Sequence, residues 1–214
     1  VYDNAMFINA LDYLLEMAPD SPQASRWKSL REGIERNVRA HLWDVKRQKF
    51  IPHIYPEKSP IPEGFDELAI HYHGGTAIAI EAGLLSKDEI RTVNAQMLEN
   101  VRLSGMPSIG LTLYPVYPDG FFHGGMSKAY LYQNGGDWTW FGGRMIQQLV
   151  VNGMVEEAYA EIHPMIERVI QNDGFYEWYG KGGVPSGSGN LKGSAGVLSK
   201  AIELLRDWAE KNKS

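Results

Sequence analysis

The sequence contains no cysteine, which excludes disulfides, thiolate zinc sites and cysteine nucleophiles. It also lacks an apolar run of membrane-spanning length and the pattern of a signal peptide. There is no basic block, and the net charge is -5, so nucleic acid and anionic membranes are poor candidates for partners. The absence of cysteine suits a cytoplasmic or a periplasmic protein equally, and the compartment stays open.

Aromatic residues are plentiful by contrast, with 6 Trp and 11 Tyr, many of them outside the segments expected to be helical. The 214 residues, 43% hydrophobic and 22% charged, suffice for one core or for a large piece of a bigger one. The chain starts at Val1 without a methionine, and we expect a fragment or a processed product. Residues 1–214 are predicted to form a single domain or the C-terminal fragment of one.

Helical segments of two kinds alternate along the chain. Mostly apolar helices are predicted over residues 4–17, 76–82, 138–151 and 194–208. Amphipathic helices are predicted over residues 22–42, 87–103 and 154–172, with apolar positions three and four apart. Ser21 is the predicted N-cap of the first amphipathic helix, and "SKDE" at Ser86 is a capping box that opens the second.

The connections alternate as well. The connections from an apolar helix to an amphipathic helix are short. The connections from an amphipathic helix to the next apolar helix have roughly twenty to thirty residues, well above the usual loop length. This repeat of α-hairpins, with a period of about sixty residues, predicts an all-α toroid, an (α/α)6 fold or an incomplete portion of one. All long loops would then share one face, where function is expected. An incomplete ring would expose apolar flanks, so we expect further helices of the same domain, or a partner, to cover them.

The stretch "DGFYEWYG" places Glu177 among aromatic residues at the entrance to a glycine-rich loop. An acid between Tyr176 and Trp178 suits sugar binding, because rings stack on sugar C–H faces while the carboxylate meets a hydroxyl or a water. Apolar neighbours also tune the basicity of a carboxylate. The alternative is a loop acid paired with a nearby Arg or Lys.

A second constellation is "YLYQNGGDWTWFGG", which precedes an apolar helix. It offers Asp137 as a possible catalytic carboxylate, and its glycines let the backbone approach a ligand. The alternative is an ordinary N-cap with packing tryptophans. Together with the first stretch, it supplies the predicted substrate-binding residues, which are Tyr132, Gln133, Trp138, Trp140 and Trp178.

Other motifs are weaker. His71 and His73 could ligate a metal only with a third ligand, so we predict no metal site and no cofactor. His123 is predicted to be a loop hydrogen-bonding residue. The glycine-rich stretch from Lys181 lacks the spacing of a phosphate-binding loop, and no serine lies in a G-x-S-x-G elbow.

Six stretches, in their order along the chain, resemble the C-terminal part of the (α/α)6 catalytic domain of six-hairpin glycosidases. They are "VYDNAMFINALDYLLEMA", "RNVRAHLWDVKRQKF", "HGGTAIAIEAGLLSKDEI", "YQNGGDWTWFGGRMI", "DGFYEWYG" and "GNLKGSAGVLSKAI". This group includes trehalase, processing α-glucosidase, amylo-α-1,6-glucosidase and the cellobiose phosphorylases. The resemblance covers essentially the whole chain. It implies a carbohydrate substrate and hydrolysis with inversion, with an α-glucoside as the expected substrate.

By this resemblance Glu177 matches the general base, which activates water while a carboxylic acid ~6.5–9.5 Å away protonates the leaving oxygen. Gln133 replaces an arginine that many members carry in the pocket loop, and Asp137 is an addition. The acid of the hydrolases usually precedes the stretch that looks like residues 1–17, so the resemblance places it outside this chain. Asp3 and Asp137 are the only substitutes here.

Three alternatives stay open. A sugar phosphorylase of the same fold is one, because Ser194 in "KGSAG" resembles part of a phosphate loop, although Trp140 stands where phosphorylases place a histidine. A carbohydrate-binding toroid fragment without catalysis is the second. The third is a helical interaction module in which glycines and aromatics only pack the loops.

Overall fold

The computed structural model describes residues 1–213, and this part of the chain contains seven α-helices. Their bounds are α1 Tyr2–Met17, α2 Ala24–Leu42, α3 His73–Glu81, α4 Lys87–Ser104, α5 Thr139–Val151, α6 Val155–Gln171 and α7 Lys192–Lys211. None of these helices is long and apolar enough to cross a membrane.

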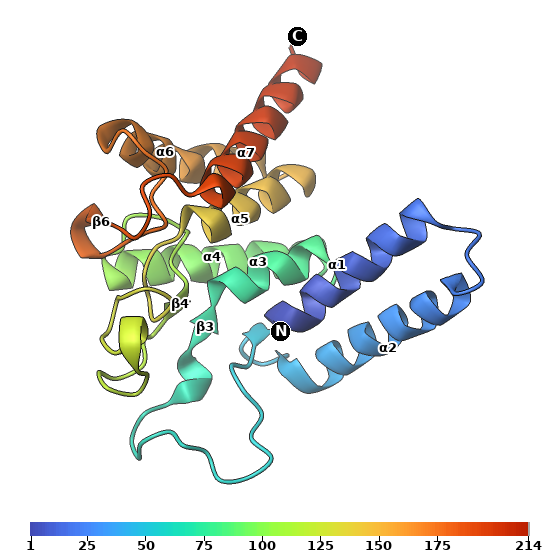
Figure 1. Ribbon diagram of the computed structural model, residues 1–214, viewed down its shortest axis with the longest axis horizontal. Helices are drawn as coiled ribbons and strands as arrows, with labels where there is room; N and C mark the ends of the chain where they lie inside the picture. The colour runs from blue at the N-terminus through green and yellow to red at the C-terminus, as the bar shows by residue number, and fades with distance from the viewer. Residues whose placement is uncertain (214) are drawn as a thin grey trace.

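The odd-numbered helices form an inner row in which α1 packs on α3, α3 on α5, and α5 on α7. The even-numbered helices lie outside this row, with α2 packed on α1, α4 on α3, and α6 on α5. In Figure 1 the helices follow one another as an arc, from the α1–α2 pair at one end to α6 and α7 at the other. The predicted alternation of inner and outer helices is therefore confirmed.

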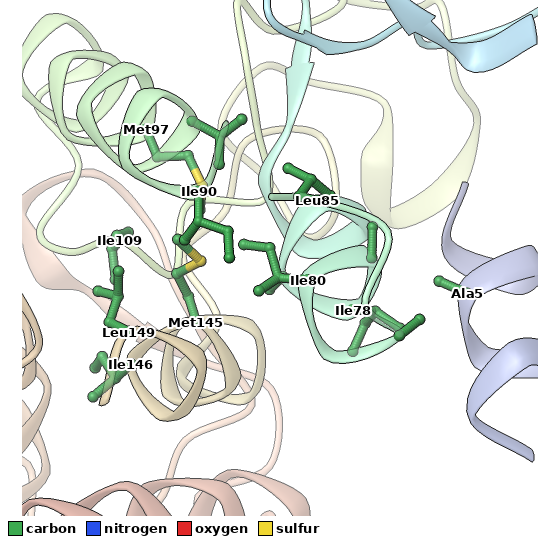
Figure 2. Packing of buried hydrophobic residues seen from close by; sticks show 14 of the residues in the cluster. Ala5, Ile78, Ile80, Leu85, Ile90, Met97, Ile109, Met145, Ile146 and Leu149 are labelled. Carbon is green, nitrogen blue, oxygen red and sulfur yellow. The ribbon is translucent and has the colours of Figure 1, made fainter. Parts of the chain in front are cut away.

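The main core lies between α3, α4 and α5. Helix α3 is buried over almost its whole length, including Ile78 and Ile80. Met97 of α4 and Met145 of α5 lie on one side of α3, and Ala5 of α1 lies on the other side, at the edge of the same cluster (Figure 2). Gly74 is required in this packing, because a Cβ atom there would overlap the ring of Phe141 on α5.

Helix α1 departs from the prediction that it is buried on most sides. Ala5, Ile8 and Leu11 are buried, but Tyr13 is 57% exposed and Met17 is 74% exposed. The reason is its position at the end of the arc, where α2 and α3 provide most of its cover and α5 contacts it at Tyr2. The expected apolar flank of an incomplete ring is thus present on α1.

The long connections comprise residues 43–72, 105–138 and 172–191, and they gather on one side of the arc (Figure 1). Short antiparallel strand pairs brace them, none of which the sequence predicted. These are β1 Trp43–Asp44 with β2 Lys49–Phe50, β3 His71–Tyr72 with β4 Leu113–Tyr114, and β5 Trp178–Tyr179 with β6 Pro185–Ser186. The 3₁₀ turns η1 Glu67–Ala69, η2 Gly124–Met126 and η3 Lys181–Gly183 lie in the same loops.

Six of the seven helices start one to three residues from the predicted position, and two of these differences concern caps. Ser21 is not the N-cap of α2, because residues 21–24 form a turn in which the N–H of Ala24 donates to the carbonyl of Ser21. Trp138 precedes α5 as its N-cap instead of belonging to it. The capping box is confirmed, since Ser86 accepts from the N–H of Glu89 and the Glu89 carboxylate accepts from the N–H of Ser86.

Candidate active site

Glu177 directly precedes β5, in the loop between α6 and α7. Its backbone N–H donates to the carbonyl of Ser188 at 2.9 Å, one residue out of register with the β5–β6 pairing. Its side chain is half-buried, and Oε2 accepts from the Ser188 N–H at 3.4 Å. The hairpin therefore holds Glu177 both at its backbone and at its carboxylate, and the side chain still contacts solvent.

Gly187 is needed for this arrangement. Its φ of +72° lies in the left-handed region that favours glycine. A Cβ atom at this position would also overlap the Glu177 side chain, with the Glu177 Cβ only 2.7 Å away. The glycine-rich loop thus provides the space into which the carboxylate fits.

Aromatic rings from several segments meet beside β5. Tyr132 contacts Trp178 and Trp138, with ring centroids 6.3 and 4.9 Å apart. Trp138 continues to Phe141 at 6.0 Å, and Phe141 contacts Trp140 at 5.0 Å. Four of the five predicted substrate-binding residues therefore belong to one aromatic cluster, although Trp138 is buried and its indole N–H donates to the Tyr132 carbonyl.

The cluster ends at a cleft of about 460 Å³. Phe141 lines this cleft, and so does Tyr2, whose ring centroid lies 6.3 Å from that of Trp140. Gln133, the fifth predicted substrate-binding residue, is exposed and lines the cleft together with Asp3. The floor includes the first turns of α1 and α3, at the loop side of the inner helices.

Asp137 lies elsewhere, in the interior, and is fully buried. The Ser108 hydroxyl donates to its carboxylate at 2.7 and 2.8 Å, and Arg168 Nη1 of α6 lies 2.7 Å from Oδ1. That contact is an ion pair without hydrogen-bond alignment among the described residues. The backbone of Asp137 exchanges two hydrogen bonds with Tyr179 of β5. This placement argues against the predicted catalytic role for Asp137, because no substrate can reach its carboxylate.

The histidines singled out in the sequence lie away from the cleft surface. His71 and His73 are buried, with ring centroids 5.2 Å apart, and their Nε2 atoms pair with Thr76 and Asn100. Burial lowers the pKa of His71 to about 3, with a smaller contribution from the charge of Lys49, and it lowers the pKa of His73 as well. His123 is exposed. Within residues 1–213, no group of three or more His, Asp or Glu side chains is placed to hold a metal ion.

One polar cluster, around Glu67, was not predicted from the sequence. Glu67 in η1 accepts hydrogen bonds at Oε1 from Tyr117, Tyr55 and His53, and the His53 ring lines the cleft. Burial alone would raise the pKa of Glu67, but these hydrogen bonds outweigh it and lower the pKa below its ordinary value. Glu67 and its donors come from two different loops, so neither spacing nor periodicity could have revealed the cluster.

Comparison with known proteins identifies the fold. No protein-family model and no curated protein sequence matches the chain, but solved structures do. The GH63 mannosylglycerate hydrolase from Thermus thermophilus in complex with glucose is 18% identical, with a TM-score of 0.64 over 95% of this chain and 44% of that chain. Its complex with Tris and D-glycerate is 17% identical, with a TM-score of 0.62 over the same shares. An uncharacterized conserved protein from the same organism is 18% identical, with a TM-score of 0.64 over 95% of this chain and 45% of that chain.

The chain thus has the fold of part of these solved structures and spans less than half of their length. The predicted fold, an incomplete portion of an (α/α)6 toroid, is confirmed. The resemblance to six-hairpin glycosidases holds at the level of the fold.

Proposed function

We propose that this chain is part of an inverting glycoside hydrolase acting on α-glucosides, and that Glu177 is its general base. The observation that carries this proposal is the setting of Glu177, a half-buried carboxylate on the loop side of the helices, next to a strand whose Trp178 joins the aromatic cluster. The fold shared with a GH63 mannosylglycerate hydrolase supports it.

In this mechanism Glu177 accepts a proton from the attacking water. The N–H of Ser188 approaches Oε2, and among the described residues Oε1 accepts no hydrogen bond, so it is free to bind that water. The aromatic residues supply apolar surface for the C–H faces of the sugar, and Gln133 supplies an amide at the cleft. A positioned base of this kind typically accelerates a reaction by about 10²–10⁴.

Inversion also needs a carboxylic acid on the opposite side of the glycosidic bond. Of the two candidates in this chain, Asp137 is sealed in the interior while Asp3 is exposed and lines the cleft. Asp3 is therefore the acid to test here. If it is not the acid, the family resemblance implies an acid from a preceding segment of the same domain.

The test is Glu177→Gln in the full-length protein, assayed for glucose release from a panel of α-linked disaccharides. We expect the rate to fall by about 10²–10⁴, and NMR of the first product formed by the wild type should show the β-anomer. Glu157→Gln, at an exposed position on α6, is the matched control and should retain activity. A Glu177→Gln rate within a few-fold of wild type would reject the assignment.

A second candidate is a carbohydrate-binding domain without catalysis. The burial of Asp137 favours it, since that burial removes one of the two carboxylates predicted beside the aromatic cluster. Saccharide binding by calorimetry without any turnover in the full-length protein would support this candidate. Phosphorolysis has less support, because Ser194 is fully buried and its hydroxyl donates to the Tyr176 carbonyl.

A further inference from the structure

The Glu67 carboxylate lies beside His53, a residue that lines the cleft. A single oxygen, Oε1, receives three donors: the Tyr117 hydroxyl at 2.7 Å, the Tyr55 hydroxyl at 2.8 Å and His53 Nδ1 at 2.7 Å. The Glu67 side chain is only 11% exposed, whereas that of His53 is 44% exposed. Desolvating a carboxylate is costly unless donors compensate it, and here three donors, one of them the half-exposed imidazole of His53, converge on one oxygen.

This contact fixes the chemistry of the His53 ring. An ionised carboxylate can only accept, so the Nδ1 atom of His53 carries the hydrogen. In the neutral ring Nε2 is then an acceptor, and no side chain or backbone group within residues 1–213 hydrogen-bonds to it. Carboxylates commonly select one tautomer and one ring orientation in this way.

The support behind Glu67 is rigid. Tyr117 is fully buried, stacks on Phe121 with ring centroids 4.8 Å apart, and accepts a hydrogen bond from the Tyr72 hydroxyl at 3.2 Å. Burial raises the pKa of Tyr117, and the hydrogen bond that it donates to the Glu67 carboxylate raises it further, so this phenol stays a donor at neutral pH. The His53 ring is thus held by a carboxylate that a buried tyrosine fixes in place, and not by a flexible surface contact.

We propose that His53, oriented by Glu67, forms a polar subsite of the cleft that binds a hydroxyl group of the sugar. This inference rests on the proposed function and extends it, because it assigns a contact on the cleft wall formed by residues 43–72, a segment without any predicted site residue. His53 lines the same cleft as Gln133 and Asp3, so a sugar held there meets an imidazole acceptor as well as an amide. Glu67 is a positioning residue, since it reaches the sugar only through His53.

The first experiment follows the histidine nitrogens by ¹⁵N NMR in the full-length protein while glucose is added. We expect His53 to show an Nδ1–H tautomer before addition and its Nε2 resonance to move on addition. His123, which is exposed and outside the cleft, is the internal reference and should not move. An Nε2–H tautomer for His53, or an unchanged His53 in the glucose complex, would overturn the proposal.

The second experiment compares glucose affinity among variants. His53→Phe keeps a ring but removes both nitrogens, and we expect affinity to fall about three- to tenfold, the range for one neutral hydrogen bond. In Glu67→Gln the carboxylate that holds the Nδ1–H tautomer of His53 is gone, so glucose affinity should fall by a similar factor. His123→Phe should bind glucose like wild type. Thermal unfolding of each variant separates the roles, since a loss of stability with unchanged affinity would mean that the cluster only ties two loops together.

The two proposals can fail separately. Glucose-induced changes at the Trp140 and Trp178 indole signals, without any at His53, would reject the subsite and leave the proposed function intact. No change at any of these residues would reject glucoside binding altogether, and the subsite with it.

Discussion

Asp137 and Glu177 show how differently two carboxylates in similar sequence surroundings can be placed. Each stands next to a tryptophan, yet Glu177 is half-buried at the loop face while Asp137 is fully buried against Arg168. The partners of Asp137 decide its role. Arg168 also donates to Thr139 at 2.7 Å and lies 4.1 Å over the ring of Tyr179, so Asp137 joins α6 to β5 and holds the strand next to Glu177.

Asp137→Asn should therefore destabilise the protein. The change leaves the Arg168 charge buried without its counterion, and removing one partner of a buried ion pair costs about 3–5 kcal/mol. Urea unfolding measures this free energy. Asp3→Asn, at an exposed position, is the control and should change the free energy of unfolding by no more than about 0.5 kcal/mol. Normal stability combined with abolished sugar release would instead return Asp137 to the catalytic residues.

At the scale of elements, the β5–β6 hairpin is the part that positions the proposed base. Gly187→Ala should strain the backbone at φ +72° and push the Glu177 side chain aside. Gly182→Ala is a matched control in the same hairpin, because Gly182 has φ +70° but open space around its Cβ position. We expect the backbone strain to cost each variant about 1–3 kcal/mol of stability. The overlap with Glu177 should add to this loss in Gly187→Ala, and only this variant should lose most of the sugar-release activity.

The comparison between these variants is made on kcat well below the unfolding temperature. Equal activities for Gly187→Ala and Gly182→Ala would show that the Glu177 position is not limiting, and would count against its role as the base. A stability loss confined to Gly187→Ala would show instead that the predicted backbone strain at Gly182 is relieved by local movement.

Sequence reasoning recovered the helices but not the short strands. The spacing predicted an apolar stripe of Ile90, Val93, Met97 and Val101, because a helix of many turns repeats its pattern. The first three are buried and Val101 is partly buried. The pairing of Trp178 with Ser186 could not be predicted, since a strand of two residues has no period to detect. The same limit hid the contact between His53 and Glu67, which depends on how an irregular loop folds back on itself.

At the scale of the whole molecule, the inner row of helices is an arc with two free ends. Helix α1 exposes Tyr13 and Met17 at one end, and α7 exposes Ile202 and Trp208 at the other. Between them, α3 has inner neighbours on both sides and an outer helix behind it, which accounts for its nearly complete burial. His73 opens α3 and His71 lies just before it, so both imidazoles occupy the best-covered part of the arc.

This burial predicts how stability depends on pH. The pKa of His71 is about 3 in the folded protein, chiefly because of burial, and the pKa of His73 is also lowered, whereas an unfolded histidine titrates near ~6.5. Below about pH 6.5 the unfolded state therefore binds protons that the folded state does not. Stability is retained above that pH and lost as the pH falls, by up to about 1.4 kcal/mol per pH unit for each histidine.

Urea unfolding between pH 7 and 5 tests this expectation above the titration range of ordinary carboxylates. His71→Gln, whose amide can still pair with Thr76, should reduce the slope of the free energy of unfolding against pH, because one of the two buried imidazoles is gone. His123→Gln, which replaces an exposed histidine, should leave the slope unchanged. A flat profile for the wild type would mean that both imidazoles accept protons within the folded arc, contrary to their burial and to the absence of a facing carboxylate among their described hydrogen-bond partners.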